Sequence, residues 1–222
     1  MPTIVRDVPR VPRSFVDAYA SLESATVYEA AGPAGAMDHT IRPITWGQRM
    51  CGRALTVRCH PADNLMLHAA IAVAEPGDVI VADVGGLLDA GYWGEITTVA
   101  AQARQIAGLV IGGGIRDRRA IVARGFPIWS AAICMRATVK RTAGDINVPV
   151  VVGGVTVHPG DLVLGDDDGV VVVAHQALAN VLDAARAREA KEAGVMEQLQ
   201  RGAFTLDLLG FRQTLEDLGI DL

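Results

Sequence analysis

Two charged residues, Arg116 and Asp117, directly follow an apolar, glycine-rich run, residues 108–115 (Gly-Leu-Val-Ile-Gly-Gly-Gly-Ile). Glu95 lies upstream, separated from Arg116 by the twenty residues 96–115. An arginine can bind a carboxylate through two parallel hydrogen bonds. An aspartate can ligate a hard divalent cation, and a helix beginning here would favour an anion. The pattern indicates a site for a metal ion and an anionic substrate at the end of a strand.

Both carboxylates also have ordinary structural explanations. An aspartate that opens a helix, as Asp117 would, is a preferred N-cap residue. A glutamate at a helix start, such as Glu95, is stabilised by the helix dipole. The sequence leaves these alternatives open. The glycines at 112–114 do not form G-x-G-x-x-G, and the acidic residue expected on a second strand is missing, so dinucleotide binding is not expected.

Two further polar residues are candidates by their spacing, and two acidic residues have structural explanations. Asn64 and His68 are four residues apart on an expected helix and can face a common ligand, although a half-buried structural histidine is commoner. Glu29 completes a Thr26-x-x-Glu29 pattern, which is the spacing of a helix capping box. Glu192 lies in a charged segment that fits a solvated helix face.

Other motifs favour structure over chemistry. The acidic run at 166–169 (Asp-Asp-Asp-Gly) lacks the spacing of a calcium-binding loop and predicts a hairpin turn. The sequence contains no H-E-x-x-H, no G-x-S-x-G and no Cys/His spacing for zinc. Lys140 lies beside Arg141, a position that Schiff-base chemistry can use, but no other residue supports that chemistry.

Composition excludes several classes of protein. A net charge of −5 argues against a nucleic-acid surface. No apolar run is long enough to cross a membrane, and residues 1–13 lack the apolar core of a signal peptide. Three cysteines without C-x-x-C spacing, Cys51, Cys59 and Cys134, are expected to be reduced and partly buried. We therefore expect a cytoplasmic protein without a membrane or nucleic-acid partner.

Strands alternate with helices in the first part of the chain, which predicts the α/β class. An irregular arm, 1–13, precedes helices at 14–22, with Ser14 as N-cap, and at 24–31. The expected order is then strand 54–59, helix 64–74, strand 79–84, loop 85–94, helix 95–106, a strand from 108, a short helix at 117–124 and a strand at 127–133.

The second part is β-rich and then helical. Short valine-rich strands are expected at 150–152, 155–157, 161–164 and 170–173. A long helix follows at 175–200, with Gly194 as a weak point, and a last helix at 206–218. The simplest organisation is one domain, 1–222, with a helical tail at 175–222.

The sequence resembles the 4-hydroxy-4-methyl-2-oxoglutarate / 4-carboxy-4-hydroxy-2-oxoadipate aldolases and the related regulators of ribonuclease E activity. The resemblance covers nearly the whole chain. It rests on the segments 24–30 (Ser-Ala-Thr-Val-Tyr-Glu-Ala), 63–68 (Asp-Asn-Leu-Met-Leu-His), 91–95 (Gly-Tyr-Trp-Gly-Glu), 114–117 (Gly-Ile-Arg-Asp), 126–130, 148–149, 159–161 and 166–170. It implies a layered α/β/β/α domain resembling a swivelling phosphohistidine domain, with a C-terminal helical extension.

Site roles follow from this resemblance. It implies that Asp117 ligates Mg²⁺ or Mn²⁺ and that Arg116 binds the carboxylate of a 2-keto acid and steadies the enolate. Glu95 and Glu192 resemble acids that hold the metal's water ligands, Glu192 from a neighbouring subunit. Substrate contacts are implied for the rest of the set: Gly94, Glu95, Ile96, Thr97, Asn64, His68 and, less directly, Glu29.

The resemblance implies a metal-dependent aldolase that releases pyruvate, with oxaloacetate decarboxylation as a side activity and a homotrimer or homohexamer as the assembly. The alternative is a non-catalytic binding protein of the ribonuclease-regulator type. Ala120 occupies a position that is acidic in many members, and Glu95 one that is often Asp. Arg118 and Arg119 either contact a distal substrate carboxylate or form a solvated helix face. The C-terminal extension, 189–222, favours the aldolase branch.

Overall fold

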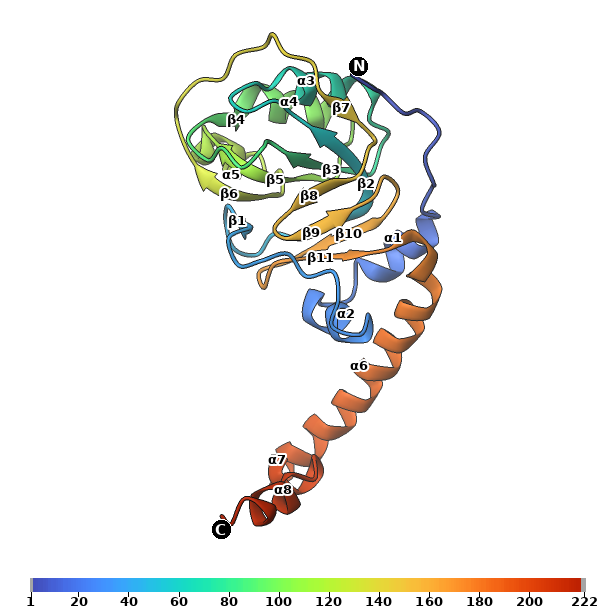
Figure 1. Ribbon diagram of the computed structural model, residues 1–222. Coiled ribbons are helices and arrows are strands. Elements are labelled where there is room, and N and C mark those ends of the chain that lie inside the picture. The colour runs from blue at the N-terminus through green and yellow to red at the C-terminus, as the bar shows by residue number, and fades with distance from the viewer. Residues whose placement is uncertain (1, 221–222) are drawn as a thin grey trace.

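Four parallel strands form the centre of the main sheet in the computed structural model, which describes residues 2–220 (Figure 1). Their order is β6, β5, β3, β2, and each is a largely apolar run, as expected of strands covered on both faces. Ile115 pairs with Ile133, so β5 and β6 end at the same edge. The bounds are β2 (Met50–Arg58), β3 (Asp78–Asp83), β5 (Gly108–Ile115) and β6 (Ile128–Ile133).

Three helices cover one face of this sheet, at the positions predicted from the sequence. They are α3 (Leu65–Val73), α4 (Glu95–Ala103) and α5 (Arg118–Ala123). Their apolar sides form one core with alternate residues of the strands, which lie within a buried cluster that includes Leu67, Ala101, Ile121, Ile80, Leu109 and Ile111. This packing fixes the N-terminal ends of α4 and α5 at the carboxyl end of β5.

The other face is covered by β-structure. The hairpin of β8 (Val150–Val152) and β9 (Val155–Val157) packs on valines of β3 and β5. Beyond β2, β10 (Leu162–Gly165) and β11 (Val170–Val173) add an antiparallel pair to the sheet. The turn between β10 and β11 is the acidic run 166–169, so the predicted hairpin turn is confirmed.

A second helical layer closes the molecule below β10 and β11 (Figure 1). It contains α1 (Arg13–Tyr19), α2 (Ser24–Ala30) and the start of α6 (Leu178–Gln200), which follows a short 3-10 turn, η1 (His175–Ala177). The order of layers is therefore helices, sheet, β-hairpins, helices. The predicted α/β class and layered α/β/β/α arrangement are confirmed.

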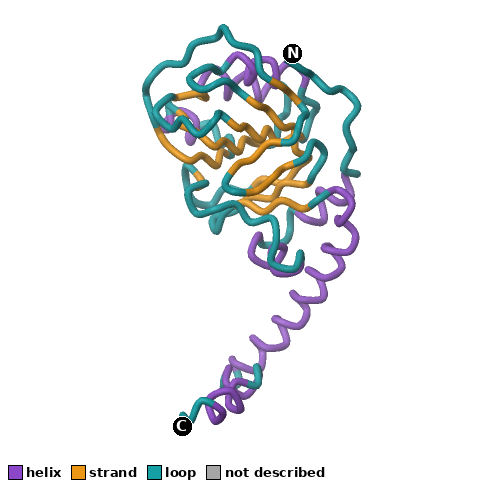
Figure 2. Tube along the Cα trace, in the orientation of Figure 1, coloured by secondary structure: helices purple, strands orange, loops and turns teal. Residues whose placement is uncertain are grey.

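The tail projects away from these layers (Figure 2). Only the first turns of α6 are buried, through Leu178, Val181, Leu182 and Ala185. α6 then continues to two short helices, α7 (Thr205–Leu208) and α8 (Phe211–Asp217), which fold together at its far end (Figure 1). Residues 221–222, the end of the predicted tail, lie outside the described residues, as does residue 1.

Several local predictions were wrong. The expected loop 85–94 contains β4 (Gly91–Trp93), and the short strands β1 (Arg42–Pro43) and β7 (Asp145–Ile146) were not predicted. The expected last helix is divided into α7 and α8 by Gly210, whose φ of 72° ends α7 and begins α8. α6 runs unbroken through Gly194.

Two predicted helix starts were also wrong. Pro12 is the N-cap residue of α1, so Ser14 lies inside the first turn. Glu23 is the N-cap residue of α2, so Thr26 and Glu29 lie within that helix and form no capping box. The three cysteines are free, as expected. Within residues 2–220, no helix combines the length and apolar character needed to cross a membrane.

Candidate active site

The carboxyl end of β5 is shaped by glycines that let other backbone segments come close. β4 pairs with β5 in parallel, with Gly91 beside Gly114. A Cβ atom on Gly114 would lie 2.5 Å from the carbonyl oxygen of Ala90, which is too close for any side chain. The glycine run therefore brings the loop before β4 onto the end of β5, directly before Arg116.

Arg116 lies across β4. Its amide donates to the carbonyl oxygen of Trp93 at 2.8 Å. Its side chain covers the positions where Gly91 and Gly94 lack a Cβ: those atoms would lie 3.1 Å and 3.2 Å from the arginine's Cβ and Cγ. Its Nε is 3.8 Å from Asp117 Oδ2. The guanidinium is thus held beside a carboxylate and partly open to solvent.

Asp117 has a left-handed backbone, with φ of 58°, and stands at the N-cap position of α5. The predicted N-cap position of Asp117 is therefore confirmed, but its side chain makes no capping hydrogen bond to the described part of α5. Instead, Oδ2 accepts a hydrogen bond from the amide of Glu95 at 3.1 Å. A non-glycine residue in this region costs free energy and tends to mark functional sites, although Asp tolerates it better than most.

The start of α4 forms the adjoining wall. Gly94 is its N-cap residue, and the Thr97 hydroxyl both donates to the Gly94 carbonyl at 2.9 Å and accepts from its amide at 3.0 Å. The amide of Glu95 is committed to Asp117. The amides of Ile96 and Thr97 belong to the first turn, where an α-helix supplies no acceptor of its own. These donors suit an anion.

The Glu95 carboxylate is held by an arginine that the sequence did not suggest. Arg124, immediately after α5, donates from Nε at 3.0 Å and from Nη2 at 2.6 Å to the same oxygen, Oε1. Among the described residues, no hydrogen bond reaches Oε2. The pairing depends on α4 packing beside α5, which residue spacing alone does not reveal.

Asn64, at the start of α3, contacts β4. It is the N-cap residue of that helix, and its Nδ2 donates to the Tyr92 carbonyl at 2.8 Å. Its Oδ1 is buried and has no hydrogen-bond partner among residues 2–220, a costly state that a ligand or water would relieve. His68 is exposed rather than half-buried. Desolvation, and then the charge of Lys140, lower the pKa of His68.

Glu29 and Glu192 do not join these residues within one chain. Both pair with Arg188 of α6, Glu192 at 2.8 Å. This cluster lies where α2 packs on α6, on the far side of the sheet from α4 and α5 (Figure 1). If these acids serve the site at Asp117, a second copy of the chain must supply them.

A hollow of about 470 Å³ lies beside the two carboxylates. Arg118, one of its lining residues, is anchored through Nε to the Ile44 carbonyl at 2.6 Å. Arg119 has no hydrogen bond or ion pair to another described residue. The full lining is Glu95, Asp117, Arg118, Arg119, Ala120 and Ala123.

The donors of the hollow fit a hard divalent cation. Mg²⁺ takes one or two carboxylates and keeps several waters, and the hollow offers two carboxylates with open space. Within residues 2–220, no group of three or more His, Cys, Asp or Glu side chains is arranged to hold a metal ion.

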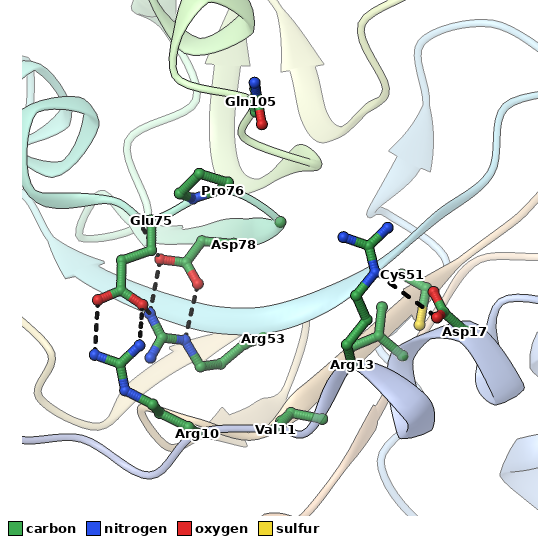
Figure 3. A pocket seen from close by; sticks show the side chains of 12 residues that line it. Arg10, Val11, Arg13, Asp17, Cys51, Arg53, Glu75, Pro76, Asp78 and Gln105 are labelled. Carbon is green, nitrogen blue, oxygen red and sulfur yellow. Dashed lines mark hydrogen bonds and ion pairs between the residues drawn. The ribbon is translucent and has the colours of Figure 1, made fainter.

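A similar cavity of about 480 Å³ lies at the opposite edge, where β3 begins (Figure 3). Its charges are already paired: Arg53 binds Asp78 at 2.8 and 2.9 Å, and Arg10 binds Glu75. Burial raises the pKa of the Cys51 thiol to about 12, so this thiol is a poor nucleophile. This cavity is where the N-terminal arm attaches.

An arginine, two carboxylates and a helix start at the carboxyl end of a parallel strand define an α/β protein with a candidate site for a small anion and a hard cation. The chain belongs to the RraA-like family (Aldolase/RraA), which matches residues 24–172. It is 33% identical over 204 residues to a Halalkalibacterium halodurans protein named "Putative 4-hydroxy-4-methyl-2-oxoglutarate aldolase", covering 92% of this chain and 95% of that one.

Solved structures share the fold. An uncharacterized protein from Pseudomonas syringae pv. tomato has a TM-score of 0.82 and 32% identity, covering 94% of this chain and 97% of that one. Streptomyces coelicolor RraAS2, described as an unusual member of the RNase ES inhibitor RraA protein family, has a TM-score of 0.78 and 27% identity, covering 85% of this chain and all of that one. The family thus includes both aldolase-named and inhibitor-named proteins.

Proposed function

We propose that this protein is a divalent-metal-dependent pyruvate aldolase. It cleaves 4-hydroxy-4-methyl-2-oxoglutarate or 4-carboxy-4-hydroxy-2-oxoadipate to pyruvate and a second keto acid. The proposal rests on one observation above all: Arg116 and the Glu95 amide converge on Asp117, at 3.8 and 3.1 Å, beside a hollow at the end of β5. The relatedness to an aldolase-named protein supports it.

Asp117 would hold Mg²⁺ or Mn²⁺ directly, with Glu95 and Glu192 holding its water ligands. When bound, the ion supplies Lewis acidity to the substrate's keto group. The remaining chemistry belongs to the chain. Arg116 binds the carboxylate of the 2-keto acid, and the first-turn amides of α4 add donors on the same side. Asn64 and His68 line the pyruvyl pocket.

Cleavage begins with loss of the C4 hydroxyl proton to a base, a water held near Glu95 or Glu192. The C3–C4 bond breaks as the C4 carbonyl forms. The electron pair of the broken bond stays with C3 and gives the enolate of pyruvate. Arg116 faces that developing charge, where a fixed cation is most effective. Protonation at C3 yields pyruvate. Oxaloacetate decarboxylation passes through the same enolate and is the expected side activity.

The site is completed by a second copy of the chain. Between residues 186 and 220 no residue is buried, although the tail carries Met196, Phe204, Phe211 and Leu218, all more than 45% exposed. Helices as short as α7 and α8 do not persist alone in water. We infer that the tail packs on a neighbouring protomer in a homotrimer or homohexamer and brings Glu192 to its site.

The test is pyruvate release from 4-hydroxy-4-methyl-2-oxoglutarate, 4-carboxy-4-hydroxy-2-oxoadipate and oxaloacetate, with Mg²⁺ or Mn²⁺ and with EDTA. We expect release that EDTA abolishes and that Asp117→Asn lowers at least 100-fold, as loss of a metal ligand would. Asn tolerates the left-handed backbone at this position, so folding is preserved. Absence of metal-dependent pyruvate from all three substrates would overturn the proposal.

A second candidate is a non-catalytic regulator of the ribonuclease E type, favoured by the similarity to the Streptomyces coelicolor protein. It predicts slower cleavage by a ribonuclease E-type enzyme in the presence of this protein. Inhibition that persists in Asp117→Asn, with no pyruvate formed by the unchanged chain, would favour the regulator.

A further inference from the structure

Arg124 occupies a special place between the two helices that carry the candidate carboxylates. It is the C-cap residue of α5, and its amide bonds back to the carbonyls of Ala120 and Ile121, both at 3.1 Å. Its own carbonyl accepts a hydrogen bond from Gln102 Nε2 at 2.9 Å. Its backbone is therefore fixed from both sides, and its guanidinium extends from a rigid point.

The guanidinium of Arg124 reaches Glu95 at the N-terminal end of α4, whereas the Arg124 carbonyl contacts Gln102 near the C-terminal end. Gln102 and Glu95 are seven residues apart, so they lie two turns apart on one side of the helix. Arg124 contacts both: its carbonyl meets Gln102, and its Nε and Nη2 meet Glu95 Oε1 at 3.0 and 2.6 Å. Arg124 thus contacts α4 near both of its ends, and its side chain binds a carboxylate that lines the hollow.

We propose that Arg124 is a positioning residue that fixes Glu95 Oε1 and so presents Oε2 to the hollow beside Asp117. This inference rests on the proposed function. A glutamate has three side-chain torsions, so holding it in one rotamer costs conformational entropy, which a bonding partner must offset. A planar guanidinium with two donors on one oxygen supplies that restraint.

A contribution to folding stability does not explain the ion pair between Arg124 and Glu95. The side chains of Arg124 and Glu95 are 40% and 43% exposed, and ion pairs with such exposure contribute little to folding. The pair between Arg49 and Glu23 is similarly exposed, at 41% and 62%, and lies outside the hollow. Arg49 also donates to the Leu22 carbonyl, so Arg49→Ala removes an exposed ion pair and a main-chain contact, both away from the hollow, and serves as the control for such a loss.

The experiment compares Arg124→Ala, Arg124→Lys and Arg49→Ala in the full-length protein. The readouts are kcat and KM for pyruvate release, and the Kd for Mn²⁺ alone from water-proton relaxation. We expect Arg124→Ala to lower kcat and weaken Mn²⁺ binding about tenfold or more, as loss of a residue that orients a metal-site acid does. KM should change little. Arg124→Lys should recover part of both, and Arg49→Ala should change neither.

A double-mutant cycle separates positioning from a general structural role. If Arg124 acts through Glu95, Arg124→Ala should have no further effect on Mn²⁺ affinity or residual kcat in a Glu95→Ala background. An equal loss in both backgrounds would overturn the inference, as would an Arg124→Ala protein with unchanged kcat and Mn²⁺ affinity. An unchanged chain that neither binds Mn²⁺ nor releases pyruvate would instead overturn the proposed function.

Discussion

At the scale of single residues, Gly94 sets the distance between α4 and Asp117. Its backbone is extended, with φ of −149°, so alanine could adopt the conformation. A Cβ atom would nevertheless lie 2.6 Å from Asp117 Oδ2, and the carboxylate would have to move. The glycine is thus required by close approach at the site and not by backbone freedom.

We therefore predict that Gly94→Ala lowers pyruvate release and Mn²⁺ affinity by about 10- to 100-fold, because a displacement of about 1 Å at a catalytic group has effects of this size. Kinetics and Mn²⁺ titration measure it. The control is Gly112→Ala in β5, where a Cβ would lie 3.7 Å from its nearest neighbours, an ordinary contact. It should leave activity and Mn²⁺ affinity nearly unchanged. Equal activity of the two variants would contradict the prediction.

Arg119 lines the hollow beside Glu95 and Asp117. Arg118 is tied to a main-chain carbonyl, so Arg119 is the cation of the hollow that remains available, among the described residues, to a second substrate carboxylate. We predict that Arg119→Ala raises KM for 4-hydroxy-4-methyl-2-oxoglutarate about threefold, the effect of one partly solvated ion pair. Exchange of the pyruvate methyl protons in D₂O, which involves no distal carboxylate, should be unchanged. A loss of both activities would contradict a role in specificity.

At the scale of elements, the β10–β11 turn connects three parts of the fold. Asp166, only 4% exposed, accepts hydrogen bonds from the Ser24 amide and hydroxyl, both at 2.6 Å, and from the Asp168 amide at 3.0 Å. Its carbonyl accepts from Trp129 Nε1 at 3.0 Å. Burial alone raises the pKa of Asp166, but these hydrogen bonds outweigh it and the pKa falls below its usual value.

A carboxyl whose pKa is lower in the folded state stabilises the fold above its unfolded pKa, about 3.9. That contribution is lost as the pH falls through the folded pKa. Asp166→Asn should therefore cost about 1–3 kcal/mol near pH 7, and the difference from the unchanged chain should shrink below about pH 4. Denaturant unfolding from pH 3 to 7 measures it. Asp168→Asn, an exposed neighbour, is the control, and a pH-independent difference would contradict the linkage.

The elements also show what the sequence could predict. Apolar runs and helical periodicity located β3, β5, α3 and α4, because burial against both faces of a sheet leaves a strong pattern. β4 was missed because three residues beginning with glycine carry no such pattern; it exists through pairing with β5. The positions of Glu95, Arg116 and Asp117 in the sequence indicated the candidate site, whereas Arg124 could not be found because its contact with Glu95 depends on helix packing.

At the scale of the whole molecule, the residues proposed for the site lie in two separate places within one chain. Arg116, Asp117 and Glu95 gather at the end of β5, while Glu192 lies on α6 across the sheet. A tail with exposed apolar residues and no buried residue between 186 and 220 suits an interface between copies. Removing residues 201–222 should leave the domain's thermal unfolding nearly unchanged, reduce the assembly to smaller species in light scattering, and abolish pyruvate release. An intact assembly after truncation would contradict this role of the tail.

Sharing of the site can be tested without truncation. Asp117→Asn and Glu192→Gln should each inactivate the homo-oligomer. In a ring with sites between neighbours, a mixed assembly contains some sites that draw Asp117 from one protomer and Glu192 from the next, and both are then unchanged. Co-expression of the two variants should restore about a quarter of the original activity if protomers mix at random. If Glu192 served its own chain, no site would be complete and the mixture would stay inactive, so the recovered activity directly reports whether α6 completes the site of another copy.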